Sequence, residues 1–124
     1  MTSTRDIDPQ APAVRRFTNP LWQPQAQNLA AVRARIDELD AQLVDLLAQR
    51  ALCVRDATRF KRDLIQVAAP TRQAEVFTRV RALASAHEAQ FPGLGDIAES
   101  TWHVLVAGFV AAEGRLLQQT EIIE

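Results

Sequence analysis

A long apolar seam is the feature that most constrains how this chain can fold. From Leu29 onward, apolar side chains recur at steps of three and four residues, the spacing of heptad a and d positions on an α-helix. The seam consists of Leu29, Val32, Ile36, Leu39, Leu43, Leu46, Cys53, Ala57, Phe60 and Leu64. We therefore expect one unbroken helix that begins after Asn28, its N-cap, and ends near Asp63.

Two further helices are expected after this seam. Pro70 is followed by a threonine, a combination typical of a helix entrance, and this helix is expected to end near residues 91–93. A third helix is expected to open with the capping-box variant Asp96-x-x-Glu99 and to run towards Gln118. Strand signals are nearly absent, since the chain has no Tyr and no Asn-Gly or Asp-Gly turn. The expected fold class is all-α, with three helices of which the first is long.

Proline and glycine divide the chain into segments. Four of the six prolines lie before residue 28, and all four glycines follow residue 92. This distribution predicts an irregular N-terminal arm over residues 1–27, a helical domain over residues 28–120 and a short C-terminal tail over residues 121–124.

The length of the first helix has a consequence for assembly. From Asn28 to Asp63 it would measure about 54 Å, whereas a compact globule of this many residues is only about 35 Å across. The projecting part would still be apolar along its seam, and a second copy of the chain is the simplest cover for it. We therefore expect a homodimer.

Composition excludes several classes of protein. A net charge of −1 and a pI of about 6.1 exclude a strongly basic nucleic-acid binder. No apolar run approaches the roughly 20 residues of a membrane span, and the first residues carry no hydrophobic signal region, so we expect a cytoplasmic protein without a membrane partner. Cys53 is the single cysteine, and His87 and His103 lack partners at ligand spacing, so no disulfide and no metal are expected.

Two cations interrupt the apolar pattern of the first helix. Arg50 sits on the seam, where a guanidinium is costly unless it pairs with a carboxylate or meets a ligand. Lys61 lies 11 residues later and returns to within roughly 20° of the same face, so the two side chains can bracket a small anion. The alternatives are a buried pair between Arg50 and a carboxylate of another helix, and a solvated helix flank for Lys61.

A carboxylate and a third cation extend this group. Glu113 continues the apolar stripe of Trp102, Val106 and Phe109, where the charged form is disfavoured and a neutral carboxyl can donate a hydrogen bond. Its alternative is an ion pair with a nearby arginine. Arg72 lies at the start of the second helix, where the helix N-terminus favours anions, unless it is an ordinary surface residue. Spacing alone thus predicts a cationic pocket for a small polyanion, without specifying a reaction.

Three basic residues recur at intervals of 17 and 11 residues: Arg33, Arg50 and Lys61. Arg33 lies in the segment Leu29–Asp40 and Arg50 ends the segment Leu46–Arg50. Arg72 supplies the next basic position, and Glu113 lies on the third helix. This order resembles the all-helical chorismate mutases, which keep the same spacing and have Gln or Glu at the last position. The resemblance covers residues 28 to 118.

The resemblance implies an intertwined homodimer with two equivalent active sites, in which Arg33 reaches into the pocket of the partner chain. It also implies the rearrangement of chorismate to prephenate, a step of aromatic amino acid biosynthesis that needs no cofactor and no metal. By this analogy Arg33, Arg50 and Arg72 hold the two carboxylates of the substrate. Lys61 donates to the ether oxygen as negative charge develops there, and protonated Glu113 donates from the opposite side.

Two departures from the family pattern keep alternatives open. Gln73 stands where family members usually carry a carboxylate that holds the ring hydroxyl, although an amide can also bind a hydroxyl. The segments Arg59–Lys61 and Ala69–Arg72 resemble isochorismate pyruvate lyase, which forms salicylate and pyruvate and is the alternative function. A second alternative is a non-catalytic helical dimer that acts as a regulatory module.

Overall fold

The computed structural model describes residues 6–123, so residues 1–5 of the expected arm and residue 124 of the expected tail lie outside the described residues. The chain forms two compact units that meet between Leu47 and Ala48. This boundary falls within the first helix, α1, which spans Leu29–Ala57.

The first unit contains the irregular arm and the first part of α1. The side chain of Asn28 accepts a hydrogen bond from the backbone N–H of Ala31 at 2.9 Å, so the predicted N-cap is confirmed. The backbone N–H of Ala30 donates to the carbonyl of Pro9 at 2.9 Å, and Pro12 forms an isolated antiparallel bridge with Asn28. These contacts fix where the arm meets the start of the helix.

The apolar seam of α1 is exposed in the single chain. No residue of α1 is buried, and four of its large seam residues are 40–62% exposed. These residues are Ile36 (48%), Leu39 (40%), Leu43 (62%) and Leu46 (59%). Cys53 is exposed as well. A helix of 29 residues is about 44 Å long, so the apolar stripe remains long although the helix is shorter than expected.

The expectation that α1 continues to Asp63 is wrong. The helix ends at Ala57, a single 3-10 turn covers Thr58–Phe60, and Lys61 is extended with φ −112° and ψ 136°. The side chain of Asp63 accepts from the N–H of Gln66 at 3.0 Å, which begins a new short helix, α2 (Leu64–Ala68). Local capping therefore overrides the apolar spacing beyond Ala57.

The second long helix, α3, spans Pro70–Ser85, so its predicted start at Pro70 is confirmed. Ala69 has a left-handed backbone (φ 40°, ψ 59°) and separates α3 from α2. The helix ends earlier than the expected residues 91–93, because residues 86–93 form a series of turns.

The third long helix, α4, spans Leu94–Leu117, and its predicted capping box is wrong. Gly93, at φ 90°, occupies the N-cap position and makes no side-chain cap. The carboxylate of Glu88 accepts instead from the N–H groups of Gly93 (2.6 Å) and Gly95 (2.9 Å). Because free N–H groups and positive charge gather at a helix N-terminus, this carboxylate stabilises the entrance to α4.

The two acids of the predicted box hold α4 to α3. Arg81 donates to Asp96 at 2.5 Å and to Glu99 at 2.7 and 2.9 Å. The hydrogen bonds to Asp96 and Glu99 raise the pKa of Arg81 above its usual range. Arg81 therefore remains a cation that ties the start of α4 to the end of α3.

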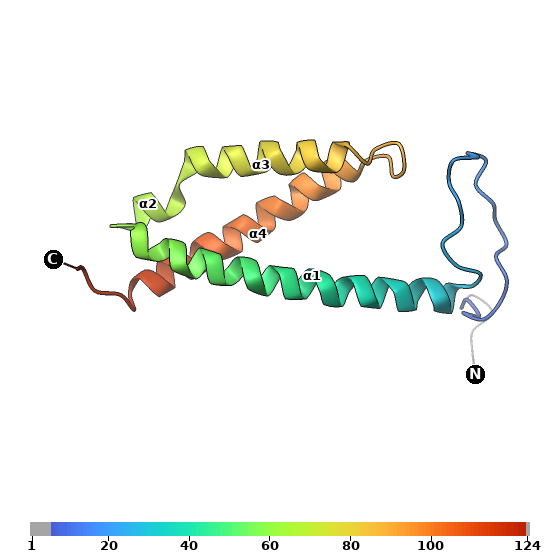
Figure 1. Ribbon diagram of the computed structural model, residues 1–124, viewed down its shortest axis with the longest axis horizontal. Coiled ribbons are helices and arrows are strands. Elements are labelled where there is room, and N and C mark those ends of the chain that lie inside the picture. Colours follow the sequence, from blue (N-terminus) through green and yellow to red (C-terminus); the bar gives the residue numbers. More distant parts are fainter. Residues whose placement is uncertain (1–5, 124) are drawn as a thin grey trace. The chain divides into compact units, whose positions relative to one another are not determined.

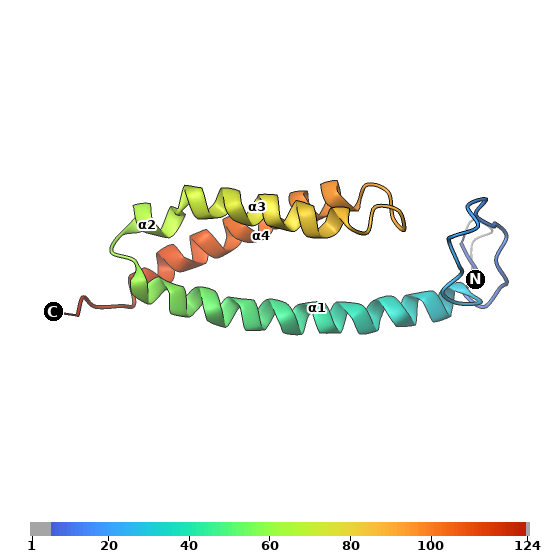
Figure 2. The same ribbon diagram turned by 45° about the horizontal axis from the view of Figure 1, so that its top comes forward.

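Packing within the second unit centres on α3 and α4, which run side by side (Figures 1 and 2). The ring of Phe77 stacks on His103, with centroids 3.8 Å apart. Val106 of α4 and Val67 of α2 are 7% and 3% exposed. These contacts hold α4 in place beside the segment that follows α1.

The expected fold class is confirmed: the described residues are helical or irregular apart from the one isolated bridge, and three of the helices are long. Within residues 6–123, we find no helix that combines the length and the apolarity needed to cross a bilayer.

We expect Glu88→Ala to lower the free energy of unfolding by about 1 kcal/mol, and Tm by about 4 °C, because the entrance of α4 loses its capping carboxylate. Thermal and urea unfolding measure this. The control is Glu38→Ala, which removes an exposed carboxylate paired with Arg35 at 3.1 Å and should cost less than about 0.5 kcal/mol. Equal losses in the two variants would contradict the capping role.

Candidate active site

A buried ion pair links the segment after α1 to the last turns of α4. Lys61 Nζ lies 2.6 Å from Glu113 Oε2, and the two side chains are 20% and 7% exposed. The extended backbone at Lys61 places this side chain beside α4. The alternative of a solvated flank for Lys61 is therefore wrong, and Glu113 pairs with a lysine rather than with an arginine.

Thr58 is a third member of this cluster, and sequence analysis missed it. The residue is 2% exposed. Its Oγ1 lies 3.3 Å from Glu113 Oε2 and 3.2 Å from the carbonyl oxygen of Val54. A buried hydroxyl needs a hydrogen-bond partner, and Thr58 has two, the carbonyl of Val54 on α1 and the carboxylate of Glu113 on α4. The sequence signal for Thr58 was its position three residues before Lys61. That position becomes informative only once the end of α1 at Ala57 is known.

Arg50 lies on the same side of α4 as this pair. Its guanidinium carbon is 5.1 Å from the ring centre of Phe109, which precedes Glu113 by one helical turn. Its Nη1 atom is buried and has no hydrogen-bond partner among residues 6–123. The alternative of a buried carboxylate partner is therefore wrong for Arg50, whose charge rests on an aromatic face instead.

An unpartnered guanidinium nitrogen is costly when it is buried, because its N–H groups lose water and gain nothing in return. Arg50 Nη1 thus has unused donors, and the Phe109 ring that Arg50 contacts lies one turn of α4 before Glu113, the partner of Lys61. An anionic group that reached it would recover the lost hydrogen bonds. This is the local arrangement that a carboxylate-binding site requires.

The remaining predicted site residues lie outside this cluster in the single chain. Arg72 is largely exposed and pairs with Glu75 at 3.4 Å on its own helix. The side-chain amide of Gln73 donates to the carbonyl of Ala68. Arg33 is exposed in the first unit, with no hydrogen bond or ion pair to any residue that the structure describes. Within the second unit, Arg50 and Lys61 both contact α4, which carries Glu113, whereas Arg72 and Gln73 bind partners around the start of α3.

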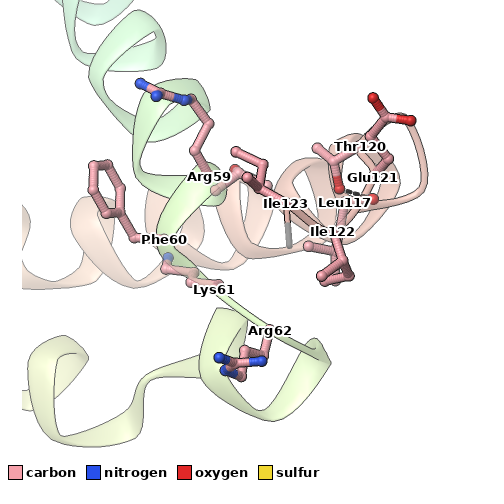
Figure 3. Close-up of a pocket in the computed structure, with 10 residues that line it drawn as sticks. Arg59, Phe60, Lys61, Arg62, Leu117, Thr120, Glu121, Ile122 and Ile123 are labelled. Carbon is pink, nitrogen blue, oxygen red and sulfur yellow. Dashed lines mark hydrogen bonds between the residues drawn. The ribbon is translucent and has the colours of Figure 1, made fainter.

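A groove of about 530 Å³ opens beside Lys61 (Figure 3). Residues 58–62 line one side, and Leu117 with residues 120–123 of the C-terminal segment line the other. Thr120 Oγ1 donates to the carbonyl of Leu117 at 2.6 Å and fixes the first turn of that segment. Lys61 therefore contacts Glu113 on one side and an open groove on the other.

The described residues hold no group of three or more His, Cys, Asp or Glu side chains able to bind a metal ion. The chemistry that this cluster offers is donation of hydrogen bonds and positive charge to an anion. Arg50 and Lys61 provide the positive charge, and Glu113 provides a group that can hold or release a proton.

Comparison with known proteins agrees with this picture of an anion site on helices. The sequence profile of the family chorismate mutase type II matches residues 32–113, well over half of the chain, and the chain belongs to this family. The matched region includes all six predicted site residues, from Arg33 to Glu113. A protein named chorismate mutase from Methanocaldococcus jannaschii is 26% identical over 96 residues, which cover 77% of this chain and 93% of that protein.

We expect Lys61→Met to lower the free energy of unfolding by about 2–3 kcal/mol, because it leaves the Glu113 carboxylate buried without its counter-ion. The double variant Lys61→Met/Glu113→Gln should recover at least half of that loss. The matched control is the exposed pair Arg35–Glu38, where Arg35→Met should cost less than about 0.5 kcal/mol. Urea unfolding measures all of these variants, and a double variant no more stable than Lys61→Met would contradict the ion pair.

Proposed function

We propose that this chain is a chorismate mutase, which rearranges chorismate to prephenate. The observation that carries the proposal is the buried Lys61–Glu113 pair beside the unpartnered Arg50 Nη1, within the segment that matches the family. The name of the relative from Methanocaldococcus jannaschii supports the same reaction.

The reaction is unimolecular and breaks an ether C–O bond while a C–C bond forms, so it needs no nucleophile, cofactor or metal. Catalysis then depends on holding the substrate in a compact conformation and on stabilising charge at the ether oxygen. Arg50 binds a substrate carboxylate through Nη1, which has no hydrogen-bond partner among the described residues. Lys61 donates to the ether oxygen as that oxygen becomes negative.

Glu113 acts in its protonated form, because only a carboxyl group can donate to the ether oxygen. Lys61 Nζ is 2.6 Å from Glu113 Oε2, too close to admit a substrate oxygen between them. Lys61 must therefore turn from Glu113 towards the substrate.

Arg72 and Gln73 complete the grip on the substrate in this proposal. Arg72 must exchange Glu75 for a substrate carboxylate, and this exchange is cheap because exposed ion pairs contribute little free energy. Gln73 binds the ring hydroxyl through its side-chain amide. The cytoplasmic location expected from the sequence stays a prediction.

The proposal includes a homodimer in which Arg33 of one chain enters the pocket of the other. The support is the exposed apolar seam on α1, with Leu43 and Leu46 each about 60% exposed. Large apolar side chains in a row on one helix face favour burial against a second helix. Arg33 lies on the same helix and pairs with no described residue of its own chain.

We expect the purified chain to consume chorismate and form prephenate, and Arg50→Ala to lower kcat/KM at least 100-fold, because a charge-assisted bidentate contact is lost. The control is Arg35→Ala, which removes an exposed arginine paired with Glu38 and should change kcat/KM less than twofold. The assay follows chorismate absorbance, with isochorismate tested in parallel. Salicylate from isochorismate without turnover of chorismate would assign the chain to the lyase instead.

We expect mixtures of the inactive variants Arg33→Ala and Arg50→Ala to regain activity after subunit exchange. In a mixed dimer, one pocket then carries both substitutions and the other carries neither. At equal amounts half of the dimers are mixed, so about a quarter of the wild-type activity should return. Mass spectrometry of the mixed dimer verifies the exchange, and exchange without recovered activity would contradict a pocket shared between chains.

A further inference from the structure

Thr58 is the residue of the site for which neither the proposed function nor the sequence pattern gives a role. It begins the 3-10 turn that follows α1 and is 2% exposed, less than either member of the ion pair beside it. Its hydroxyl is 3.3 Å from the carboxylate oxygen of Glu113 that also binds Lys61.

The hydroxyl of Thr58 has one proton and two possible acceptors. It can donate to Glu113 Oε2, or it can donate to the carbonyl of Val54 at 3.2 Å and accept a proton donated by Glu113. The first arrangement suits a charged Glu113 or a neutral one whose proton is on Oε1, and the second suits a neutral one whose proton is on Oε2. Rotation about a single bond of Thr58 therefore satisfies Glu113 in both of its protonation states.

The helix itself does not require this arrangement. Thr101 of α4 also donates to the carbonyl four residues earlier, Ile97, at 2.7 Å, but it is exposed and contacts no carboxylate. A threonine that only back-bonds to its helix needs neither burial nor an acid partner. Thr58 differs from Thr101 in having both.

We propose that Thr58 is a positioning residue that holds Glu113 in place during the reaction. The inference rests on the proposed function, in which Lys61 leaves Glu113 to meet the substrate. At that moment Thr58 is the described partner that remains on Oε2, since no other hydrogen bond to Glu113 occurs within residues 6–123. In this contact Thr58 donates to Oε2, so the one proton of Glu113 is carried on Oε1, where it faces the breaking bond.

The test compares Thr58→Val, which replaces the hydroxyl by a methyl group of similar size, with Thr58→Ser, which keeps the hydroxyl. We expect Thr58→Val to lower kcat about tenfold, equivalent to about 1.4 kcal/mol of transition-state stabilisation. KM should change less than twofold, because Glu113 donates to the ether oxygen only as charge develops there. Thr58→Ser should retain at least half of the wild-type kcat.

Thr101→Val is the matched control, since it removes the same back-bond without touching Glu113, and it should leave kcat and KM unchanged. All rates with chorismate are measured at a temperature well below the Tm of each variant. Each rate is divided by the concentration of folded protein. If Thr58→Val does not fold, Thr58→Ser and Thr58→Ala, which differ by one oxygen atom, replace it, with the same tenfold difference expected.

Three results would overturn the positioning role while leaving the mutase activity intact: an unchanged kcat in Thr58→Val, equal losses in the Val and Ser variants, or a rise in KM alone. The first shows that the hydroxyl is dispensable, the second that only side-chain shape matters, and the third that the hydroxyl serves substrate binding. A wild-type chain that does not convert chorismate would overturn the proposed function, and this inference with it.

Discussion

The ion pair between Lys61 and Glu113 is the interaction on which the rest of the site depends. Burying two charges is costly, and their attraction offsets that cost only when geometry and further hydrogen bonds are favourable. Here the distance of 2.6 Å and the hydroxyl of Thr58 meet this requirement. The pair also determines the path of the chain, because the extended backbone at Lys61 interrupts the helical run after α1 and sets its side chain against α4.

Much of this arrangement could be predicted from the sequence, because its signals are periodic. Apolar spacing identified the long first helix, and proline identified the start of α3. The same periodicity placed Glu113 on an apolar face, and the structure finds it 5% exposed. Helical periodicity reports which residues share a face, and it is reliable wherever that face is buried by a neighbour.

The features that could not be predicted all depend on side chains that compete for backbone groups or act across a turn. Apolar spacing continued to Leu64, yet capping by Asp63 starts a new helix there. Asp96 and Glu99 resemble a capping box, but Arg81 binds both, and Glu88 caps α4 from seven residues before Gly95. Each outcome is decided by which partner the folded chain brings within reach, and sequence spacing does not contain that information.

Arg50 shows how the site divides its tasks between stability and binding. In the resting chain Lys61 and Glu113 neutralise each other, whereas the buried Arg50 Nη1 makes no hydrogen bond within the described residues and rests its charge on Phe109. A cation–π contact returns less free energy than a carboxylate does, so this guanidinium lowers stability where it lies. Natural proteins keep a buried polar group without a hydrogen-bond partner chiefly at functional sites. In the proposed function, the donors that Arg50 leaves unused within the chain are the ones that bind an anion from outside it.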